Sequence, residues 1–170
     1  MLAERIIFLR EDQYSKFYHQ RYGIDTLEKQ GLSVEFWDCS KIFRKHVQGD
    51  HQTSDLNGFS GLRHFDHKDE LLENITKLTA SDIMVTAMPI GIKNLGVQRQ
   101  IASTKVFWGT MRLAELPVPE GESYFRSRID KFFRKPSTGL NFLLQKLPLA
   151  RLGLRPMDFI LVGGTAPLIG

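Results

Sequence analysis

The chain has 170 residues, of which 42% are hydrophobic and 25% charged, which is the composition of a soluble globular domain. Its one cysteine, Cys39, excludes an internal disulfide and a cysteine-rich zinc site. No window has the roughly 18 apolar residues needed to span a bilayer, and the first residues show no apolar signal-peptide core. We therefore expect a cytoplasmic protein in a reducing compartment.

The net charge of +4 conceals an uneven distribution. Residues 1–85 carry 11 Lys/Arg and 14 Asp/Glu, whereas residues 86–170 carry 12 Lys/Arg and 5 Asp/Glu. Within 123–155 there are eight basic residues and a single acid, Asp130. The excess positive charge therefore belongs to one segment, and a partner attracted by it is expected there.

The first forty residues predict a strand, a helix and a second strand. Residues 5–9 are a short apolar run, typical of a strand buried between two helical layers. A helical pattern continues from 14 to about 30, with Asp12 as its N-cap and Gly23 as a weak point inside it. Residues 32–38 then alternate as a second strand.

The rest of the chain continues this alternation of strands and helices. After a loop, the pattern predicts helices over 67–80, 95–102, 122–134 and 139–151, and strands over 82–88, 105–109 and 158–164. The sum is an α/β fold, a doubly wound, mostly parallel sheet of about five strands with helices on both faces, Rossmann-like in architecture. By analogy with such folds we expect the strand order 3-2-1-4-5, counted along the chain.

The last strand comes late, and no helix follows it to cover the sheet. We therefore expect residues 1–170 to form a single Rossmann-like domain that is the N-terminal half of a longer protein. The basic segment 123–155 lies within this domain.

Ligands bind such sheets at the carboxyl ends of the strands. The first of these positions reads Arg10-Glu11-Asp12-Gln13, which lacks the glycines of a dinucleotide fingerprint. Arg10 and Asp12 are candidate ligand-binding residues there, and Glu11 is a candidate general base. Asp38, at the end of the second strand, stands where an acid would bind a ribose. The alternative for Glu11 and Asp12 is an acidic pair favoured by a helix dipole.

Another candidate ligand-binding turn follows the final strand at Gly163, Gly164 and Thr165. Adjacent glycines let backbone N–H groups approach a phosphate or a sugar closely. The alternative is a tight turn without a ligand. His64 and His67 have a spacing that metal ligands use, but the spacing specifies no third ligand, so we predict neither a metal site nor a cofactor.

The segment 123–155 combines apolar residues at helical spacing with basic residues between them. Its first half holds the basic residues Arg126, Arg128, Lys131, Arg134 and Lys135. This combination predicts a surface for a membrane or a partner, where anionic lipid contributes about 1 kcal/mol per basic residue. The alternative is an ordinary core-facing helix with a solvated basic face. Nucleic-acid binding is disfavoured, because the aromatic residues lie on the apolar stripe rather than among the charges.

Two stretches carry a resemblance to a known family. Residues 22–38, which run from Tyr-Gly-Ile to Phe-Trp-Asp, and residues 158–164, Asp-Phe-Ile-Leu-Val-Gly-Gly, together cover about a fifth of the chain. They resemble the N-terminal half of bacterial surface-polysaccharide biosynthesis glycosyltransferases, which have two Rossmann-like domains (a GT-B-like type).

The resemblance implies that this chain is the acceptor-side domain, inactive alone. Its partners would be a C-terminal nucleotide-sugar-binding domain of the same parent protein and a lipid-linked acceptor at the inner face of the cytoplasmic membrane, where the protein would be peripheral. The alternative is a noncatalytic Rossmann-like binding or assembly domain that acts through the basic helical segment.

Overall fold

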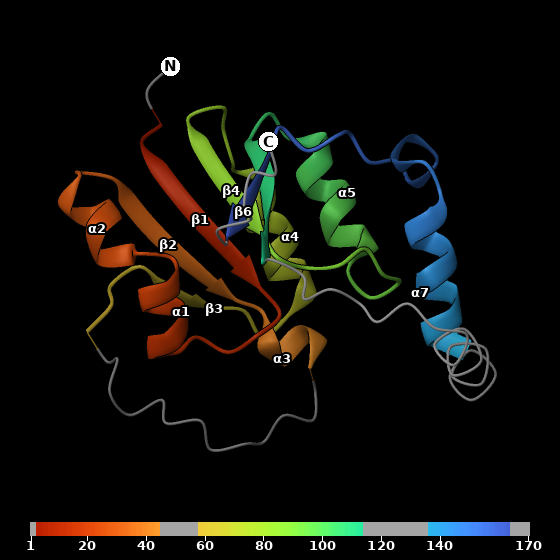
Figure 1. Ribbon diagram of the computed structural model, residues 1–170, viewed down its shortest axis with the longest axis horizontal. Helices are drawn as coiled ribbons and strands as arrows, with labels where there is room; N and C mark the ends of the chain where they lie inside the picture. The colour runs from red at the N-terminus through yellow and green to blue at the C-terminus, as the bar shows by residue number, and fades with distance from the viewer. Residues whose placement is uncertain (1–2, 45–57, 114–135, 164–170) are drawn as a thin grey trace, which may run out of the picture.

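A computed structural model describes residues 3–44, 58–113 and 136–163 (Figure 1). Its strands are β1 (Arg5–Arg10), β2 (Ser33–Asp38), β3 (Leu62–His64), β4 (Asp82–Thr86), β5 (Phe107–Leu113) and β6 (Phe159–Gly163). Within the described residues they form one sheet in the order β3-β2-β1-β4-β5-β6, and all five neighbouring pairs are parallel. The expected α/β fold with a parallel, Rossmann-like sheet is confirmed, with six strands in place of about five.

Helices lie on both faces of this sheet. They are α1 (Lys16–Arg21), α2 (Ile24–Lys29), α3 (Ser40–Phe43), α4 (Lys68–Thr76), α5 (Leu95–Ser103), α7 (Pro136–Lys146) and the 3₁₀ helix η1 (Leu149–Leu152). Helices α1 and α2 cover one face of β1 and β2, whereas α4 and α5 cover the opposite face of the sheet (Figure 1). Helix α7 lies beyond α5, on the side away from α1 and α2.

Counted along the chain, the observed order begins 3-2-1-4-5 as expected and adds β6 at the edge, but the third strand is not the segment that was predicted. The predicted third strand, here β4, lies beside β1 and not beside β2. The place beside β2 is taken by β3, a strand of three residues that the sequence pattern did not reveal. Two of its residues, Arg63 and His64, are exposed, so the strand has no apolar alternation to mark it.

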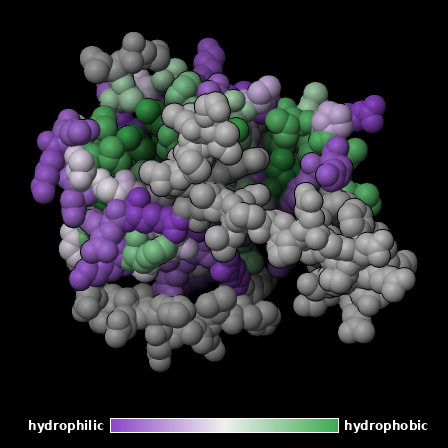
Figure 2. All heavy atoms as spheres, viewed as in Figure 1, coloured by the Kyte–Doolittle hydropathy of each residue, from purple (hydrophilic) through white to green (hydrophobic). Residues whose placement is uncertain are grey.

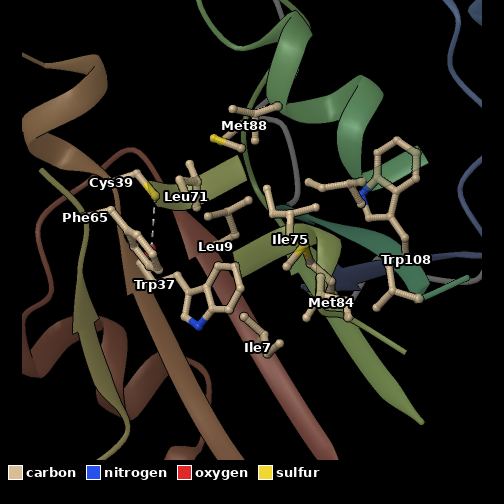
Figure 3. Close-up of a cluster of buried hydrophobic side chains, with 14 of the residues drawn as sticks. Ile7, Leu9, Trp37, Cys39, Phe65, Leu71, Ile75, Met84, Met88 and Trp108 are labelled. Atoms are coloured by element: carbon tan, nitrogen blue, oxygen red, sulfur yellow. Dashed lines mark hydrogen bonds between the residues drawn. The ribbon is translucent and has the colours of Figure 1, made fainter. Parts of the chain in front are cut away.

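The core has two parts, one on each side of the sheet. Strand β1 contributes to both, because Ile7 and Leu9 point to one face and Phe8 to the other. The larger part lies between the sheet and helices α4 and α5. Figure 3 shows its buried side chains, among them Trp37 and Trp108, around the middle of β1. A strand buried on both faces confirms the prediction made from the apolar run at 5–9.

The predicted helix from 14 to 30 is divided in two by Gly23. This residue has φ 59°, in the left-handed region that glycine adopts at little cost. It lies between α1 and α2, where its backbone turns the chain. The predicted N-cap was also wrong: the cap of α1 is Ser15, and Asp12 lies in the preceding loop, bonded to other side chains.

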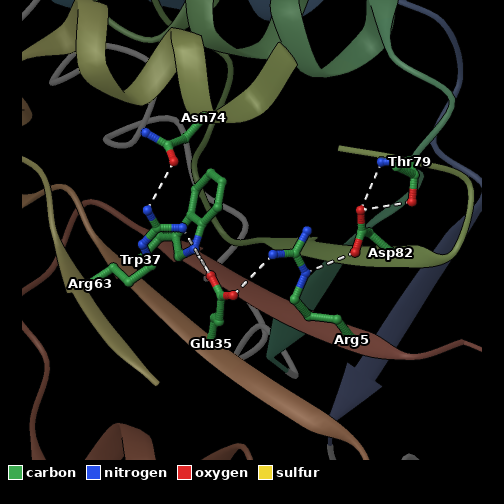
Figure 4. A network of polar contacts seen from close by, with 7 residues as sticks. All are labelled: Arg5, Glu35, Trp37, Arg63, Asn74, Thr79 and Asp82. Carbon is green, nitrogen blue, oxygen red and sulfur yellow. Dashed lines mark hydrogen bonds and ion pairs between the residues drawn. The ribbon is translucent and has the colours of Figure 1, made fainter. Parts of the chain in front are cut away.

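A polar network ties β1 to its two neighbours, β2 and β4, near the amino ends of the strands (Figure 4). Arg5 donates from Nε to Asp82 (2.8 Å) and from Nη1 to Glu35 (3.0 Å), so β1 is joined to β4 and to β2. Trp37 Nε1 donates to the same Glu35 carboxylate at 2.7 Å. Burial alone would raise the pKa of Asp82, but the hydrogen bonds from Arg5 and Thr79 hold it below its ordinary value. These charges are therefore paired structural groups.

The described residues include only part of the predicted basic segment. The predicted helix over 139–151 corresponds to α7 followed by η1, which lie on either side of Pro148. The predicted helix over 122–134 lies outside the described residues.

Candidate functional site

The switch point of the sheet lies between β1 and β4. From β1 the chain proceeds outward through β2 and β3, then returns to the other side of β1 as β4 and proceeds outward through β5 and β6. Loops that leave neighbouring strands in opposite directions open a crevice at the carboxyl edge, where open α/β sheets bind ligands. Here the loop after Arg10 and the loop after Thr86 flank this position, which we call the crevice.

Asn94 joins these two loops. Its Nδ2 donates to Glu11 Oε1 and to the Pro89 carbonyl, each at 2.7 Å. Its Oδ1 accepts from the Gly91 backbone N–H at 2.9 Å. The side chain is buried and its amide is bonded on both sides, so one residue fixes the β4–α5 loop and orients the candidate base Glu11.

Gln98, one turn further along α5, strengthens the same loop. Its Nε2 donates to the Met88 carbonyl at 3.2 Å. The residue is fully buried, and its Oε1 has no hydrogen-bond partner in the part of the chain that the structure describes. The side-chain amides of Asn94 and Gln98 therefore both hold the loop between β4 and α5 that borders the crevice.

Two arginines converge on Asp12 on the other side of the crevice. Arg10 donates from Nη2 to Asp12 Oδ2, and Arg44 Nη1 lies 2.6 Å from Oδ1. The hydroxyl of Tyr18 also donates to Oδ2 at 3.0 Å. Arg10 is held in turn by the Tyr22 hydroxyl, 3.0 Å from Nη1, and its guanidinium stacks over the Tyr18 ring at 4.6 Å. The structure thus brings the predicted residues Arg10 and Asp12 together.

This cluster shifts the titration of its members. Burial favours the neutral acid at Asp12, but the hydrogen bond and charge of Arg10, with Tyr18 and Arg44, lower the pKa of that carboxyl below its ordinary value. Burial also raises the pKa of Tyr22, against the nearby charge of Arg10. Asp12 is therefore an anion bound by two cations, and the cluster has a net positive charge. Figure 2 shows hydrophilic side chains gathered around α1 and the carboxyl end of β1.

Asp38 lies at the end of β2, as predicted, and is 2% exposed. Its Oδ2 accepts from the Tyr14 backbone N–H at 3.1 Å, and its Oδ1 accepts from that of Ser40 at 2.9 Å. His64 Nδ1 is 3.3 Å from Oδ2. Both oxygens are thus engaged by the chain itself, and Asp38 shapes the loops after β1 and β2. A ribose contact at Asp38 stays a prediction.

The other predicted ligand-binding residues are not brought to this crevice. Gly163 ends β6, which is separated from β1 by β4 and β5. Gly164, Thr165 and the five basic residues between 126 and 135 lie outside the described residues. Among the residues that are described, no group of three or more His, Cys, Asp or Glu side chains is arranged to hold a metal ion. Of the predicted histidine pair, His64 contacts Asp38.

Sequence reasoning missed three residues of the site, Asn94, Arg44 and Tyr18. An asparagine directly before a predicted helix signals an N-cap. However, Asn94 makes no side-chain cap bond to α5 and bonds the preceding loop and Glu11 instead. Arg44 lies at the end of α3, so only the folded chain shows that it meets Asp12.

Helix α7 carries leucines that face away from the protein. Leu140 and Leu143 on α7, and Leu147 directly after its end, lie on one stripe and are 48%, 52% and 41% exposed. The opposite side of the helix holds the loop after β4: Asn141 Oδ1 accepts from the Ile92 N–H at 2.9 Å, and Gln145 Nε2 donates to a carbonyl of the same loop. The leucine stripe, defined as these three leucines, is thus attached to the loop that forms one side of the crevice.

A cavity of about 450 Å³ lies elsewhere, at the amino ends of β2 and β3. Glu28, Ser33, Glu35 and Arg63 contribute polar side chains to it. It is far from the carboxyl edge of the sheet, and the Glu35 carboxylate already pairs with Arg5. The carboxyl-edge crevice is therefore the better candidate site.

In comparisons with known proteins, no family model matches the sequence, and no curated protein or solved structure matches it. Within the described residues, none of the helices has the length and apolar character needed to cross a membrane.

Proposed function

We propose that this chain is the acceptor-side domain of a glycosyltransferase in cell-surface polysaccharide biosynthesis, and that it binds a lipid-linked sugar at the switch-point crevice. The observation that carries the proposal is the attachment of an outward-facing apolar stripe to a polar crevice. An acceptor with a sugar and a lipid chain has a polar part for the crevice and an apolar part for the leucine stripe, which lies on the side of α7 opposite the crevice loop. The hydrogen bond between Asn141 and Ile92 joins α7 to that loop.

Glu11 is the general base in this proposal. The acceptor hydroxyl attacks the anomeric carbon of a nucleotide-sugar, the bond from that carbon to the nucleoside diphosphate breaks, and the hydroxyl proton passes to the Glu11 carboxylate. Asn94 occupies Oε1 of Glu11 and orients the carboxylate. The donor would be held by a C-terminal nucleotide-sugar-binding domain of the same parent protein, so this chain would be inactive alone.

Acceptor binding is tested by NMR on the isotope-labelled chain. A lipid-linked sugar in neutral detergent is expected to shift amide signals in the loops that contain Glu11 and Asn94, whereas nucleotide-sugars shift them little. Glu11→Gln keeps the size of the side chain and is expected to retain binding. Glu28→Gln, on α2, is the matched control. Shifts confined to α2, or a stronger response to nucleotide-sugar than to acceptor, would contradict the proposal.

Membrane docking is tested by sedimentation with vesicles. Apolar side chains at a surface favour insertion into the acyl boundary, and basic residues add attraction to anionic lipid. Replacing Leu140, Leu143 and Leu147 with serine is expected to abolish co-sedimentation with anionic vesicles. Phe17→Ser is the control, because Phe17 is 59% exposed on α1, away from the leucine stripe. Equal binding to neutral and anionic vesicles would contradict the electrostatic part.

Glutamine substitution of the five predicted basic residues, Arg126, Arg128, Lys131, Arg134 and Lys135, extends the same assay. Loss of vesicle binding supports their contribution to the membrane surface.

A noncatalytic assembly domain is the second candidate, because the same leucine stripe fits an apolar face of a partner protein. It predicts no binding to vesicles and no acceptor-induced shifts around Glu11. The two assays above therefore separate the two functions.

A further inference from the structure

We propose that Arg10 and Arg44 form a phosphoryl-binding site whose place Asp12 occupies in this structure. The inference deepens the proposed function, on which its biological meaning rests, by naming the chemical class of the group that binds beside the crevice. Its chemistry is tested on this chain without any transfer reaction.

The charges of Arg10, Arg44 and Asp12 favour this site. Two guanidinium groups are directed at one carboxylate, one at each oxygen, which leaves a net positive charge at the cluster. Glu11 and Asp38 do not pair with these arginines: Glu11 is bonded to Asn94, and Asp38 accepts two backbone N–H groups. A dianionic phosphoryl group would balance two arginines better than the single charge of Asp12 does.

Arg10 is held in place by groups other than Asp12. The guanidinium of Arg10 is bonded to the hydroxyls of Tyr18 and Tyr22 and stacks on the Tyr18 ring, so its orientation does not depend on Asp12 alone. Its Nε–H is buried without a partner in the described part of the chain, so the group is not fully satisfied. An oriented guanidinium loses little side-chain entropy when it binds an anion.

An anion can reach the site from solvent. Arg44 is exposed for 49% of its side chain, and Asp12 for 19%. Asp12 is in the irregular loop between β1 and α1, outside any helix or strand. The carboxylate can therefore leave the arginines when a stronger anion arrives, without unfolding an element. The Tyr18 hydroxyl, which now donates to Asp12, would then donate to a phosphoryl oxygen.

The test is calorimetric titration of the chain with inorganic pyrophosphate, with Asp12→Asn and Arg44→Gln compared with the unmodified protein. Asp12→Asn removes the competing carboxylate and is expected to tighten pyrophosphate binding roughly fivefold or more. Arg44→Gln removes a charge-assisted hydrogen bond and is expected to weaken it roughly tenfold. Unchanged affinity in Asp12→Asn would overturn the proposal.

Lys41→Gln is the matched control for charge. Lys41 is on α3, which ends just before Arg44. It pairs with Asp66 at 3.0 Å and lies outside the cluster, and its substitution also removes one positive charge. We expect less than a twofold change. An equal loss in Lys41→Gln and Arg44→Gln would show general attraction to a basic surface and overturn the site. Circular dichroism of each variant checks that it is folded, and the Arg44→Gln comparison remains decisive if Asp12→Asn is unstable.

Further titrations distinguish the source of the phosphoryl group. Vesicles of phosphatidic acid in phosphatidylcholine, compared with phosphatidylcholine alone, test a lipid headgroup. Competition by soluble pyrophosphate against those vesicles indicates that both use Arg10 and Arg44. Pyrophosphate binding with no acceptor-induced shift at Glu11 would support this site and contradict the proposed function. Acceptor-induced shifts without pyrophosphate binding would do the reverse.

Discussion

The side-chain amide of Asn94 donates to the carboxylate of Glu11 at 2.7 Å, although 83 positions separate the two residues in the chain. The bond crosses the switch point of the sheet and connects the loop after β1 with the loop after β4. A ligand in this crevice would meet two loops that are already fixed relative to each other.

Replacement of Asn94 tests how much this link stabilises the protein. Asn94→Ala removes three hydrogen bonds from a buried position and leaves the Gly91 N–H without its acceptor. We expect unfolding free energy to fall by about 2 kcal/mol, with a melting temperature lower by roughly 4–8 °C. Asn74→Ala, at an exposed bond on α4, is the control and should change stability by about 0.5 kcal/mol or less. Equal losses of unfolding free energy in the two variants would contradict a stabilising role for the link between Asn94 and Glu11.

The division between α1 and α2 is tested at Gly23. A side chain there has open space, with the nearest atom 4.0 Å from an added Cβ, so any cost comes from the positive φ. Gly23→Ala is expected to destabilise the protein by about 1 kcal/mol in urea unfolding. Gly96→Ala, inside α5, should instead stabilise by up to about 1 kcal/mol, because an added Cβ meets only the flexible end of Lys68. The prediction is that the two substitutions change the free energy of unfolding in opposite directions.

The short edge strand β3 depends on close approach at Gly61. A Cβ added to Gly61 would lie 2.0 Å from the backbone oxygen of Val34, which cannot move without distorting β2. We expect Gly61→Ala to separate β3 from β2 at a cost of roughly 2 kcal/mol. Hydrogen exchange at Phe36 checks this, because its N–H donates to the Gly61 carbonyl. Unchanged protection of the Phe36 amide would show that the strand pairing tolerates the side chain.

The raised pKa of Tyr14 predicts that the protein loses stability in alkali. Burial, with smaller contributions from Asp25 and Glu28, raises the pKa of its phenol to about 12, and its hydroxyl is bonded to Nδ1 of His19. Because the folded pKa lies above the unfolded value of about 10, the neutral phenol stabilises the fold below pH 10, and this contribution disappears as pH rises towards 12. Unfolding free energy of the natural protein should fall over that interval more steeply than that of Tyr14→Phe. Parallel curves would refute the assignment.

The local elements were accessible from the sequence, because strands β1 and β2 and helix α5 each carry a pattern of several residues. The weak point at Gly23 was visible for the same reason. Strand β3 has three residues, two of them exposed, so no periodicity identifies it. Strand β3 occupies the edge of β2, and β4 lies beside β1. Because the sequence pattern did not reveal β3, the predicted order placed β4 beside β2.

The candidate site was predicted in part. Arg10, Glu11 and Asp12 follow a recognisable strand, so their position at the carboxyl edge could be read from the chain. Their partners Asn94 and Arg44 belong to later elements, and only the pairing of β1 with both β2 and β4 brings them close. Side-chain contacts across the sheet are properties of topology, which a local pattern does not contain.

The central place of β1 also has a consequence for how the chain folds. This strand is synthesised before the other strands of the described sheet, and its pairing with β2 closes a short loop, but its pairing with β4 brings Arg5 to Asp82, 77 positions away. Closing a longer loop costs more chain entropy, and parallel pairing over such separations is slow. On a ribosome, one side of β1 would acquire its neighbour while the other remains an open edge until residue 86 has emerged. Until then, β1 would be the region most exposed to pairing with another chain.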